Sequence, residues 1–204
     1  MKAFVYVGGT VSPQDIRERP APDDLTVAAD CGYRNALLCG VRPMLTVGDF
    51  DSGRAPEDGE ILTLPQEKDE TDGQYAVREA IRRGADEIVI VGGMNGRIDH
   101  TLSCLAILEE CAAMGIPAVV TDGKCRTRCL KDGTFILRRD GYRYFSLIAL
   151  DGVVSGVFLE GAKYPLSDAE IRRPSQYAVS NEIVGEQASV TVGSGTVYLI
   201  ESNG

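Results

Sequence analysis

The residues with the clearest chemical potential are two aspartates placed two positions apart. The segment 48–52 reads Gly-Asp-Phe-Asp-Ser and directly follows the apolar run 45–47. Alternate side chains of an extended segment point the same way, so Asp49 and Asp51 can converge on one hard cation such as Mg2+. An acidic surface turn explains an isolated Asp-x-Asp sequence equally well, and the motif alone does not decide between the two.

Two further acidic positions occur at the beginnings of expected helices. The segment 68–72, Lys-Asp-Glu-Thr-Asp, precedes a helical pattern, and Thr71 or Asp69 could cap that helix while Asp72 stands in its first turn. Asp30 ends the apolar run 25–29, in the same position relative to its strand as Asp49. Taken alone, each of these aspartates is explained more simply by helix capping than by chemistry.

A glycine-rich loop provides the third chemical feature. The segment 92–100 reads Gly-Gly-Met-Asn-Gly-Arg-Ile-Asp-His and follows the apolar run 87–91. Glycines allow a backbone to approach phosphates closely, and Arg97 at a helix start could hold a phosphoryl oxygen through two hydrogen bonds. The loop has neither the Walker A lysine nor the GxGxxG spacing. For His100, the only histidine, packing or capping at the helix start is favoured over general-base catalysis.

The elements that position these residues alternate between apolar runs and helical patterns. We expect strands at 2–7, 25–29, 45–47, 60–64, 87–91 and 118–121, and helices at 32–40, 71–83 and 99–114. Each helical pattern closes on a glycine: Gly40, Gly84 and Gly115. This alternation predicts an α/β domain with a parallel sheet and crossover helices.

The character of the chain changes after about residue 123. Short alternating runs separated by turn residues predict an antiparallel β-domain, with a turn at Gly193, Ser194 and Gly195 between its last two strands. We therefore place a domain boundary near residues 122–132, dividing the chain into domains 1–125 and 126–204.

In a parallel sheet, all the candidate side chains fall at one edge. Strand C-termini, or the helix starts beyond them, carry Asp30, Asp49, Asp51, Asp72 and Asp99 together with Lys68 and Arg97. Carboxylates gathered there repel one another unless a cation neutralises them, and the basic side chains suit a polyphosphate bridged by Mg2+. The residues alone thus predict metal-assisted phosphoryl transfer.

Composition excludes several other classes. The formal net charge of −9, without a basic stripe, argues against nucleic acid as a partner. No apolar stretch approaches the roughly 20 residues of a membrane span, and the N-terminal apolar run is too short for a signal peptide, so we expect a cytoplasmic protein and no membrane partner. Six cysteines without a CxxC pair favour reduced thiols over structural zinc or disulfides.

Six ordered segments resemble the thiamine pyrophosphokinase family. They are Ala-Asp-x-Gly at 29–32, Gly-Asp-Phe-Asp-Ser at 48–52, Lys-Asp-x-Thr-Asp at 68–72, Gly-Arg-x-Asp-His at 96–100, Gly-x-Lys-Tyr-Pro-Leu at 161–166 and Ser-Asn-Glu at 180–182. The resemblance implies an N-terminal α/β domain for ATP and Mg2+ and a C-terminal β-sandwich domain for thiamine. It also implies a homodimer whose thiamine sites lie between subunits.

The resemblance implies an activity and a set of site residues. Thiamine's hydroxyl would attack ATP, so that a diphosphoryl group moves and AMP leaves. Metal ligation is implied for Asp49, Asp51 and Asp72, and catalytic roles for these three with Arg97 and Asp99. Substrate binding is implied for Asp30, Lys68, Arg97 and His100 at the phosphate end, and for Ser180 and Asn181 at the thiamine pyrimidine.

The chain departs from the family pattern in two places. Residues 31–33 read Cys-Gly-Tyr where Gly-Gly-Ala is common, and no tryptophan is present to stack on thiamine. Tyr177 could supply an aromatic face instead, or could simply pack as a strand residue.

Two other functions fit parts of the sequence. A haloacid-dehalogenase-like phosphatase would use Asp49 and Asp51 as nucleophile and acid, but that motif follows the first strand there and the third expected strand here. A non-catalytic thiamine- or nucleotide-binding protein would be expected to lose metal ligands. Because all candidate ligands are present, catalysis is favoured.

Overall fold

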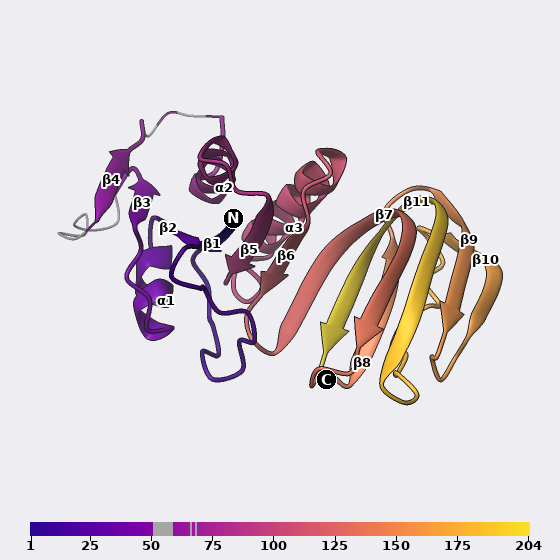
Figure 1. The fold of residues 1–204 in the computed structure, drawn as a ribbon. Coiled ribbons are helices and arrows are strands. Elements are labelled where there is room, and N and C mark those ends of the chain that lie inside the picture. The colour runs from indigo at the N-terminus through magenta and orange to yellow at the C-terminus, as the bar shows by residue number, and fades with distance from the viewer. Residues whose placement is uncertain (51–58, 66, 68) are drawn as a thin grey trace. The chain divides into compact units, whose positions relative to one another are not determined.

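The computed structural model of the chain describes residues 1–50, 59–65, 67 and 69–204 (Figure 1). Two of the predicted site residues, Asp51 and Lys68, therefore lie outside the described residues. The chain forms two compact units, Met1–Lys124 and Cys125–Gly204. Within the described residues, no helix combines the length and the apolar character needed to cross a membrane.

Unit 1 is built on a parallel sheet. Its strands are β1 (Lys2–Tyr6), β2 (Leu25–Ala29), β3 (Leu45–Gly48), β4 (Glu60–Thr63), β5 (Glu87–Val91) and β6 (Ala118–Thr121). They pair in the order β6-β5-β1-β2-β3-β4, every neighbour parallel, as the sequence predicts. The chain starts at β1, moves outward to β4 and then returns to the other side of β1. Strand order therefore reverses between β1 and β5, and such a reversal is where open α/β sheets bind ligands.

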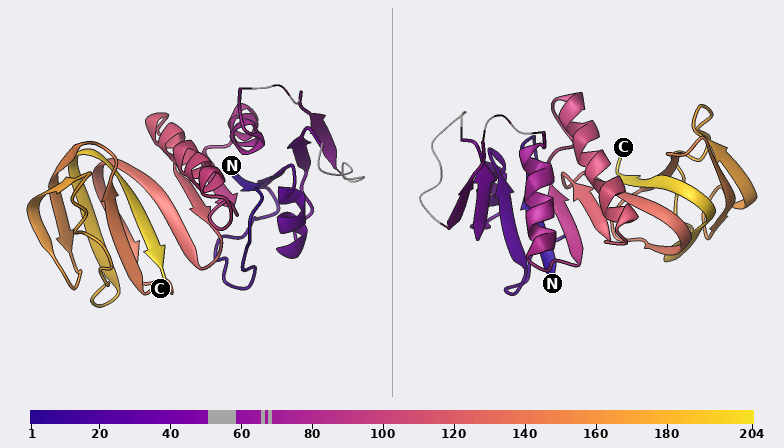
Figure 2. Two further views of the ribbon diagram at one scale, coloured as in Figure 1. Left: turned by 180° about the vertical axis from the view of Figure 1, so that it is seen from behind. Right: turned by 90° about the horizontal axis from the view of Figure 1, so that it is seen from above.

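In the described part of unit 1, the helices between these strands are α1 (Gly32–Leu38), α2 (Asp72–Arg82) and α3 (Ile98–Ala113). Figure 2 shows α2 and α3 side by side. Each helix ends on its predicted glycine, with φ of 74° at Gly40, 93° at Gly84 and 71° at Gly115. At all three ends the glycine N–H and the next N–H donate back to the last turn, for example Gly40 to Leu37 and Val41 to Ala36, both at 2.9 Å. This is the Schellman arrangement, which needs a left-handed residue that glycine adopts without strain.

The α1 face of the sheet shows why the strands read as apolar. Phe4 and Tyr6 on β1 lie beside Val89 and Val91 on β5, and all four pack with Ala36 of α1. Their neighbours along the strands are also buried, because a crossover-helix sheet is covered on both faces. The strands consequently show no polar alternation.

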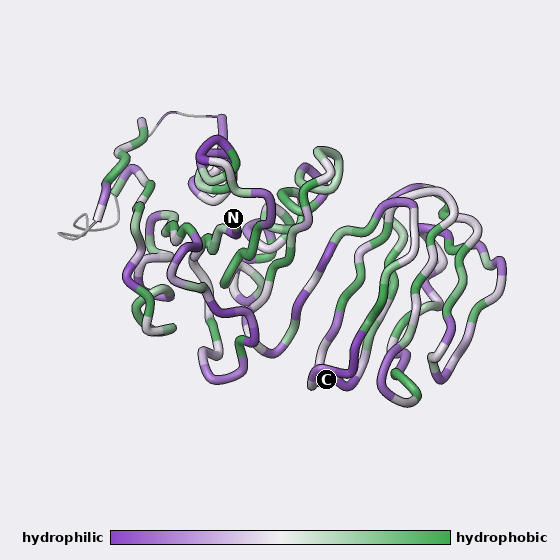
Figure 3. The backbone as a smooth tube through the Cα atoms, in the orientation of Figure 1, coloured by the Kyte–Doolittle hydropathy of each residue, from purple (hydrophilic) through white to green (hydrophobic). Residues whose placement is uncertain are grey.

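Unit 2 consists of antiparallel strands, as predicted. They are β7 (Cys125–Arg138), β8 (Tyr144–Ala149), β9 (Val153–Glu160), β10 (Leu166–Arg172) and β11 (Gln187–Ser202). β11 pairs with β7 along its length, with β9 over its first part and with β8 over its second, and β10 pairs with β9. Figure 3 shows polar and apolar residues mixed along these strands, which places alternate side chains in the core.

The turn predicted at residues 193–195 is wrong. β11 runs through this segment, and its register against β7 shifts between Val192 and Thr196, as at a β-bulge. A Cβ on Gly193 would lie 3.0 Å from the Gly156 Cα, so glycine is required by a close approach of two strands and not by chain reversal.

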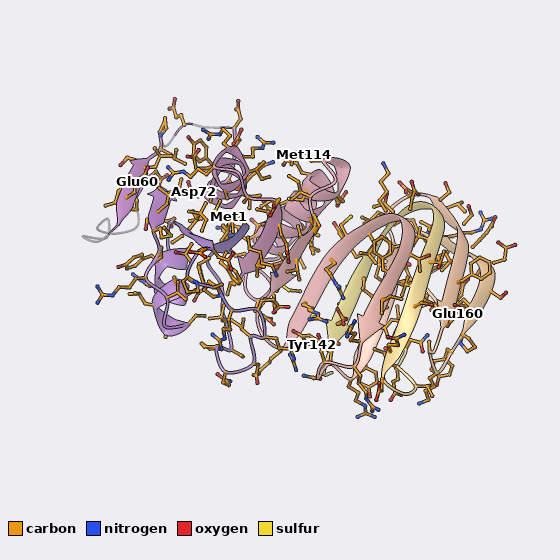
Figure 4. All side chains as sticks on the ribbon, in the orientation of Figure 1. Met1, Glu60, Asp72, Met114, Tyr142 and Glu160 are labelled. Carbon is orange, nitrogen blue, oxygen red and sulfur yellow. The ribbon has the colours of Figure 1, made fainter. Side chains whose placement is uncertain are left out.

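A buried ion network joins β7 to β11 in unit 2. The Glu201 side chain is 2% exposed and accepts from Arg126 Nε at 2.7 Å, from Arg126 Nη2 at 2.9 Å and from Arg128 Nη2 at 2.5 Å. Arg126 also pairs with Asp140 at 2.6 Å and lies 4.8 Å from the ring centroid of Tyr142, which Figure 4 labels. Burial raises the pKa of Glu201, but the arginines outweigh it and the net pKa is lowered.

We predict that Glu201→Gln lowers the free energy of unfolding of unit 2 by about 3 kcal/mol near neutral pH, because two partly buried guanidinium groups lose their shared, buried anion. Since the folded pKa lies below the ordinary 4.5, the Glu201 contribution is present above 4.5 and is lost as pH falls through the folded pKa. The difference between variant and wild type should therefore shrink below pH 4.5. Denaturant-induced unfolding, measured at several pH values, tests this prediction, with Glu160→Gln at an exposed position as the control. Equal stability of Glu201→Gln and wild type at pH 7 would contradict it.

Candidate active site

Asp30 and Asp49 lie at adjacent strand ends of unit 1. β2 and β3 pair in parallel, and the Asp30 N–H donates to the Val47 carbonyl at 2.7 Å. A Cβ on Gly48 would stand 3.2 Å from the Asp30 Cα and 3.3 Å from its Cβ, so this close approach favours glycine before Asp49. Both aspartates are half-buried.

Two residues at these strand ends, one of them Asp30 itself, have unusual backbone conformations. Asp30 has φ of 44° and Phe50 has φ of 53°, in the left-handed region that non-glycine residues seldom adopt. Such positions persist only where the surroundings hold them, and they concentrate at functional sites. Their occurrence directly at two neighbouring strand ends supports a site at this edge.

The segment before α2 combines capping with an ion network. Thr71 is the N-cap and its side chain accepts from the Gln74 N–H at 3.2 Å, so the capping interpretation is confirmed for Thr71. Asp72 follows as the first residue of α2, half-buried and labelled in Figure 4. Glu70 pairs with Arg78, whose Nε also donates to Glu110 of α3 at 2.7 Å. The segment is therefore tied to both helices.

Arg97 and Asp99 form a bidentate ion pair at the start of α3. Arg97 Nε and Nη2 donate to the two Asp99 oxygens at 3.2 and 2.6 Å, and the His100 N–H donates to the same carboxylate at 3.0 Å. The hydrogen bond from Arg97 holds the pKa of Asp99 below its ordinary value. The side chains are 72% and 59% exposed, and His100 is exposed. The guanidinium fork is thus oriented by Asp99 and accessible to an anion.

The described residues contain no group of three or more histidine, cysteine, aspartate or glutamate side chains that could hold a metal ion. Of the predicted metal ligands, Asp49 and Asp72 are described, whereas Asp51 lies outside the described residues. The metal assignment of Asp49, Asp51 and Asp72 therefore stays a prediction, as does the phosphate role of Lys68.

Sequence reasoning missed a second glycine pair at this edge. Gly8 and Gly9 follow β1, as Gly92 and Gly93 follow β5, and the Gly93 N–H donates to the Gly8 carbonyl at 2.8 Å. The same Gly-Gly pair occurs directly after the apolar runs 2–7 and 87–91, and this repetition could have identified it from the sequence. Asn35 of α1 bonds the same loop, and nothing in the sequence marked it.

In unit 2, the structure brings the 161–166 and 180–182 segments together. Asn181 is 3% exposed; its Nδ2 donates to the Tyr164 carbonyl at 2.7 Å, and its Oδ1 accepts from the N–H groups of Tyr164 and Glu182 at 3.0 and 2.9 Å. Lys163 pairs with Glu182 at 2.7 Å, which lowers the pKa of Glu182. Ser180 is exposed, with φ of 56°.

These contacts refine what the thiamine candidates can do. The Asn181 amide fixes two backbone segments, and the exposed side chains of Ser180 and Tyr164 stand next to it in the chain or in space. Tyr177 is 52% exposed and its hydroxyl donates to the Glu170 carbonyl at 2.7 Å, so it is not buried in the core of the unit.

Comparisons with known proteins agree with this architecture. The chain is similar to the crystal structure of thiamine pyrophosphokinase from Bacillus subtilis, with a TM-score of 0.89, 25% identity and 99% of both chains covered. It is similar to thiamin pyrophosphokinase from Geobacillus thermodenitrificans, with a TM-score of 0.87, 28% identity and 99% and 97% covered. In sequence it is 29% identical to the Bacillus subtilis protein over 186 residues, 87% of each chain.

The parallel-sheet unit with its carboxylates at the strand ends, joined to an antiparallel unit, is the fold of a class of diphosphotransferase enzymes. The family model "Thiamin pyrophosphokinase, catalytic domain" matches residues 21–120, and "Thiamin pyrophosphokinase, vitamin B1 binding domain" matches residues 134–197. The chain belongs to the thiamin pyrophosphokinase family.

Proposed function

We propose that the protein transfers a diphosphoryl group from ATP to the hydroxyl of thiamine, giving thiamine diphosphate and AMP. The observation that carries this proposal is the match of two family models in order, a catalytic domain within residues 1–124 and a vitamin B1 binding domain within residues 125–204. Unit 1 would bind ATP and Mg2+, and unit 2 would be the β-sandwich domain that binds thiamine.

The chemistry of the donor set suits Mg2+. Asp30 and Asp49 place half-buried carboxylates at neighbouring strand ends, and hard oxygen ligands are those that Mg2+ prefers. We propose that Asp49, Asp51 and Asp72 hold the ion, with Asp30 nearby. When bound, Mg2+ would neutralise charge on the ATP phosphates.

The side chains of the chain itself mainly position the reactants. The hydroxyl oxygen of thiamine forms a bond to the β-phosphorus of ATP. The bond from that phosphorus to the oxygen that bridges it to the α-phosphorus breaks, and AMP leaves with the electron pair. Arg97, oriented by Asp99, and Lys68 would hold phosphate oxygens. The hydroxyl proton passes to a carboxylate of the cluster, Asp72 or a neighbour.

An experiment with radioactively labelled ATP distinguishes transfer of a diphosphoryl group from transfer of a single phosphoryl group. With ATP labelled at the γ-phosphorus, we expect all label consumed to appear in thiamine diphosphate, with unlabelled AMP as the other product. Labelled thiamine monophosphate with ADP, or free labelled phosphate without thiamine product, would contradict the proposal.

At the thiamine end, we predict that Asn181→Ala raises the thiamine KM roughly 5- to 150-fold, equivalent to about 1–3 kcal/mol, and leaves the ATP KM nearly unchanged. The amide anchors Tyr164 and Glu182, and its loss leaves part-buried backbone groups without these partners. Asn203→Ala, which removes one acceptor from the Arg143 N–H, is the control. A folded Asn181→Ala variant with a wild-type thiamine KM would reduce Asn181 to a structural residue.

We also propose a cytoplasmic homodimer in which each thiamine site is built from two chains, as the family resemblance implies. Mixing Asn181→Ala with Asp51→Asn subunits should then restore activity above that of either variant, because hybrid sites combine two intact halves. Failure in a heterodimer confirmed by mass spectrometry would reject the shared site while leaving the reaction itself unaffected.

A further inference from the structure

We propose that Asn35 is a positioning residue for the nucleotide, acting through the two glycine loops that follow β1 and β5. This inference rests on the proposed function, since it takes these loops as the border of the ATP phosphate site. Asn35 is 6% exposed and lies on α1, which begins at Gly32, two residues after Asp30. Its side-chain amide donates to backbone carbonyls of the loop after β1.

The two loops pack backbone against backbone. The Gly93 N–H donates to the Gly8 carbonyl at 2.8 Å, and the Thr10 N–H donates to the Asn95 carbonyl at 3.4 Å. A Cβ on Gly92 would stand 2.6 Å from the Val7 oxygen, and one on Gly9 would stand 2.8 Å from the Asn95 oxygen. Side chains are therefore excluded from this junction, and the conformation of one loop depends on that of the other.

The Asn35 side chain, on α1, donates hydrogen bonds to the loop after β1 at this junction. Its Nδ2 donates to the Val7 carbonyl at 2.7 Å and to the Gly9 carbonyl at 2.9 Å, which uses both hydrogens of the amide. The same nitrogen lies 3.2 Å from where a Cβ of Gly92 would be. The bond to the Val7 carbonyl is buried and the bond to the Gly9 carbonyl is part-buried. A buried carbonyl without a donor is costly, so loss of the donor at position 35 destabilises this conformation of the first loop.

The position of this side chain connects it to the reaction. The strand order reverses between β1 and β5, and the loops beyond these two strands are the ones that Asn35 fixes. The second loop continues to Arg97, and the helix carrying Asn35 follows Asp30. The buried amide thus fixes the loop after β1, and that loop is hydrogen-bonded to the loop after β5, which leads to Arg97.

The test compares Asn35→Asp with wild type in the full-length chain. Aspartate has nearly the same shape but offers no amide donor to the two carbonyls. We expect the Kd for ATP with Mg2+, measured by calorimetry, to rise at least ~10-fold while the thiamine KM changes by less than about twofold. Hydrogen exchange at the Gly93 and Thr10 amides should accelerate in the same variant.

Ala36→Gly is the matched control, because it weakens α1 at the next position without removing a bond to the loops. It should leave the Kd for ATP within about twofold of wild type. If Asn35→Asp does not fold, Asn35→Ala, which removes both amide donors without adding a charge, is measured against the same expectations.

A folded Asn35 variant with wild-type ATP affinity would overturn the inference, and so would equal weakening in Ala36→Gly, since the effect would then follow helix stability. A wild-type chain that binds no ATP would overturn the proposed function and the inference together. That result is distinguishable from the first, in which wild type and variant both bind ATP.

Discussion

Asp49→Asn is expected to lower kcat by at least roughly 1000-fold, about 4 kcal/mol in transition-state stabilisation, while the protein remains folded. Asparagine preserves the shape of the side chain but removes one negative charge from the proposed metal site. Because Asp49 lies beside Asp30 at the edge of the sheet, the loss of charge also relieves repulsion between carboxylates. The melting temperature without metal should therefore stay equal or rise.

Asp86→Asn provides the matched control for this experiment. Asp86 is a highly exposed aspartate just before β5 and pairs with the N-terminal amine at 2.7 Å. Its replacement should leave kcat within about twofold, since surface pairs contribute little. Near-normal turnover of Asp49→Asn at saturating Mg2+ would remove Asp49 from the metal site, and loss of the folded state would assign it a structural role.

Arg97→Lys is expected to reduce kcat on the order of 10- to 1000-fold, although the positive charge is kept. The reason is geometric: Arg97 presents a planar fork, already aligned by its two hydrogen bonds to Asp99, and lysine cannot hold two phosphate oxygens in the same way. If the clamp acts in the transition state, kcat falls more than the ATP KM rises.

Arg82→Lys serves as the control for the arginine substitution, because Arg82 is an exposed arginine that pairs with Glu79 within α2. We expect its kinetics to match those of wild type. Wild-type kinetics in Arg97→Lys as well would show that Arg97 serves only to pair with Asp99 at the start of α3.

The local rules of the sequence predicted most of unit 1. The strands at 25–29, 87–91 and 118–121 were predicted to the residue, and the helices end on Gly40, Gly84 and Gly115. These predictions were correct because an apolar strand and a helix end at a left-handed glycine are each determined by a few neighbouring residues. The prediction of a turn at 193–195 was wrong because Gly193 lies close to Gly156 on another strand, and this contact cannot be read from the neighbouring residues in the sequence.

The site shows the same division. The charged candidates could be selected from the sequence because carboxylates follow several apolar runs in succession, although each alone fits a cap or a turn. Asn35 could not be predicted, because a single asparagine within a helix has the same sequence pattern whether its side chain faces water or bonds two backbone carbonyls of another loop. Asn181 was selected through the family motif, yet two of its three backbone hydrogen bonds go to Tyr164, 17 residues away, and only the third goes to the adjacent Glu182.

The most direct test of the central claim is the release of AMP by the purified protein, measured with ATP and thiamine present together and singly. We predict that AMP forms only when both substrates are present, in equal amount to thiamine diphosphate and without ADP. AMP release from ATP alone at the same rate, or no AMP with both substrates and Mg2+, would contradict the proposed diphosphoryl transfer.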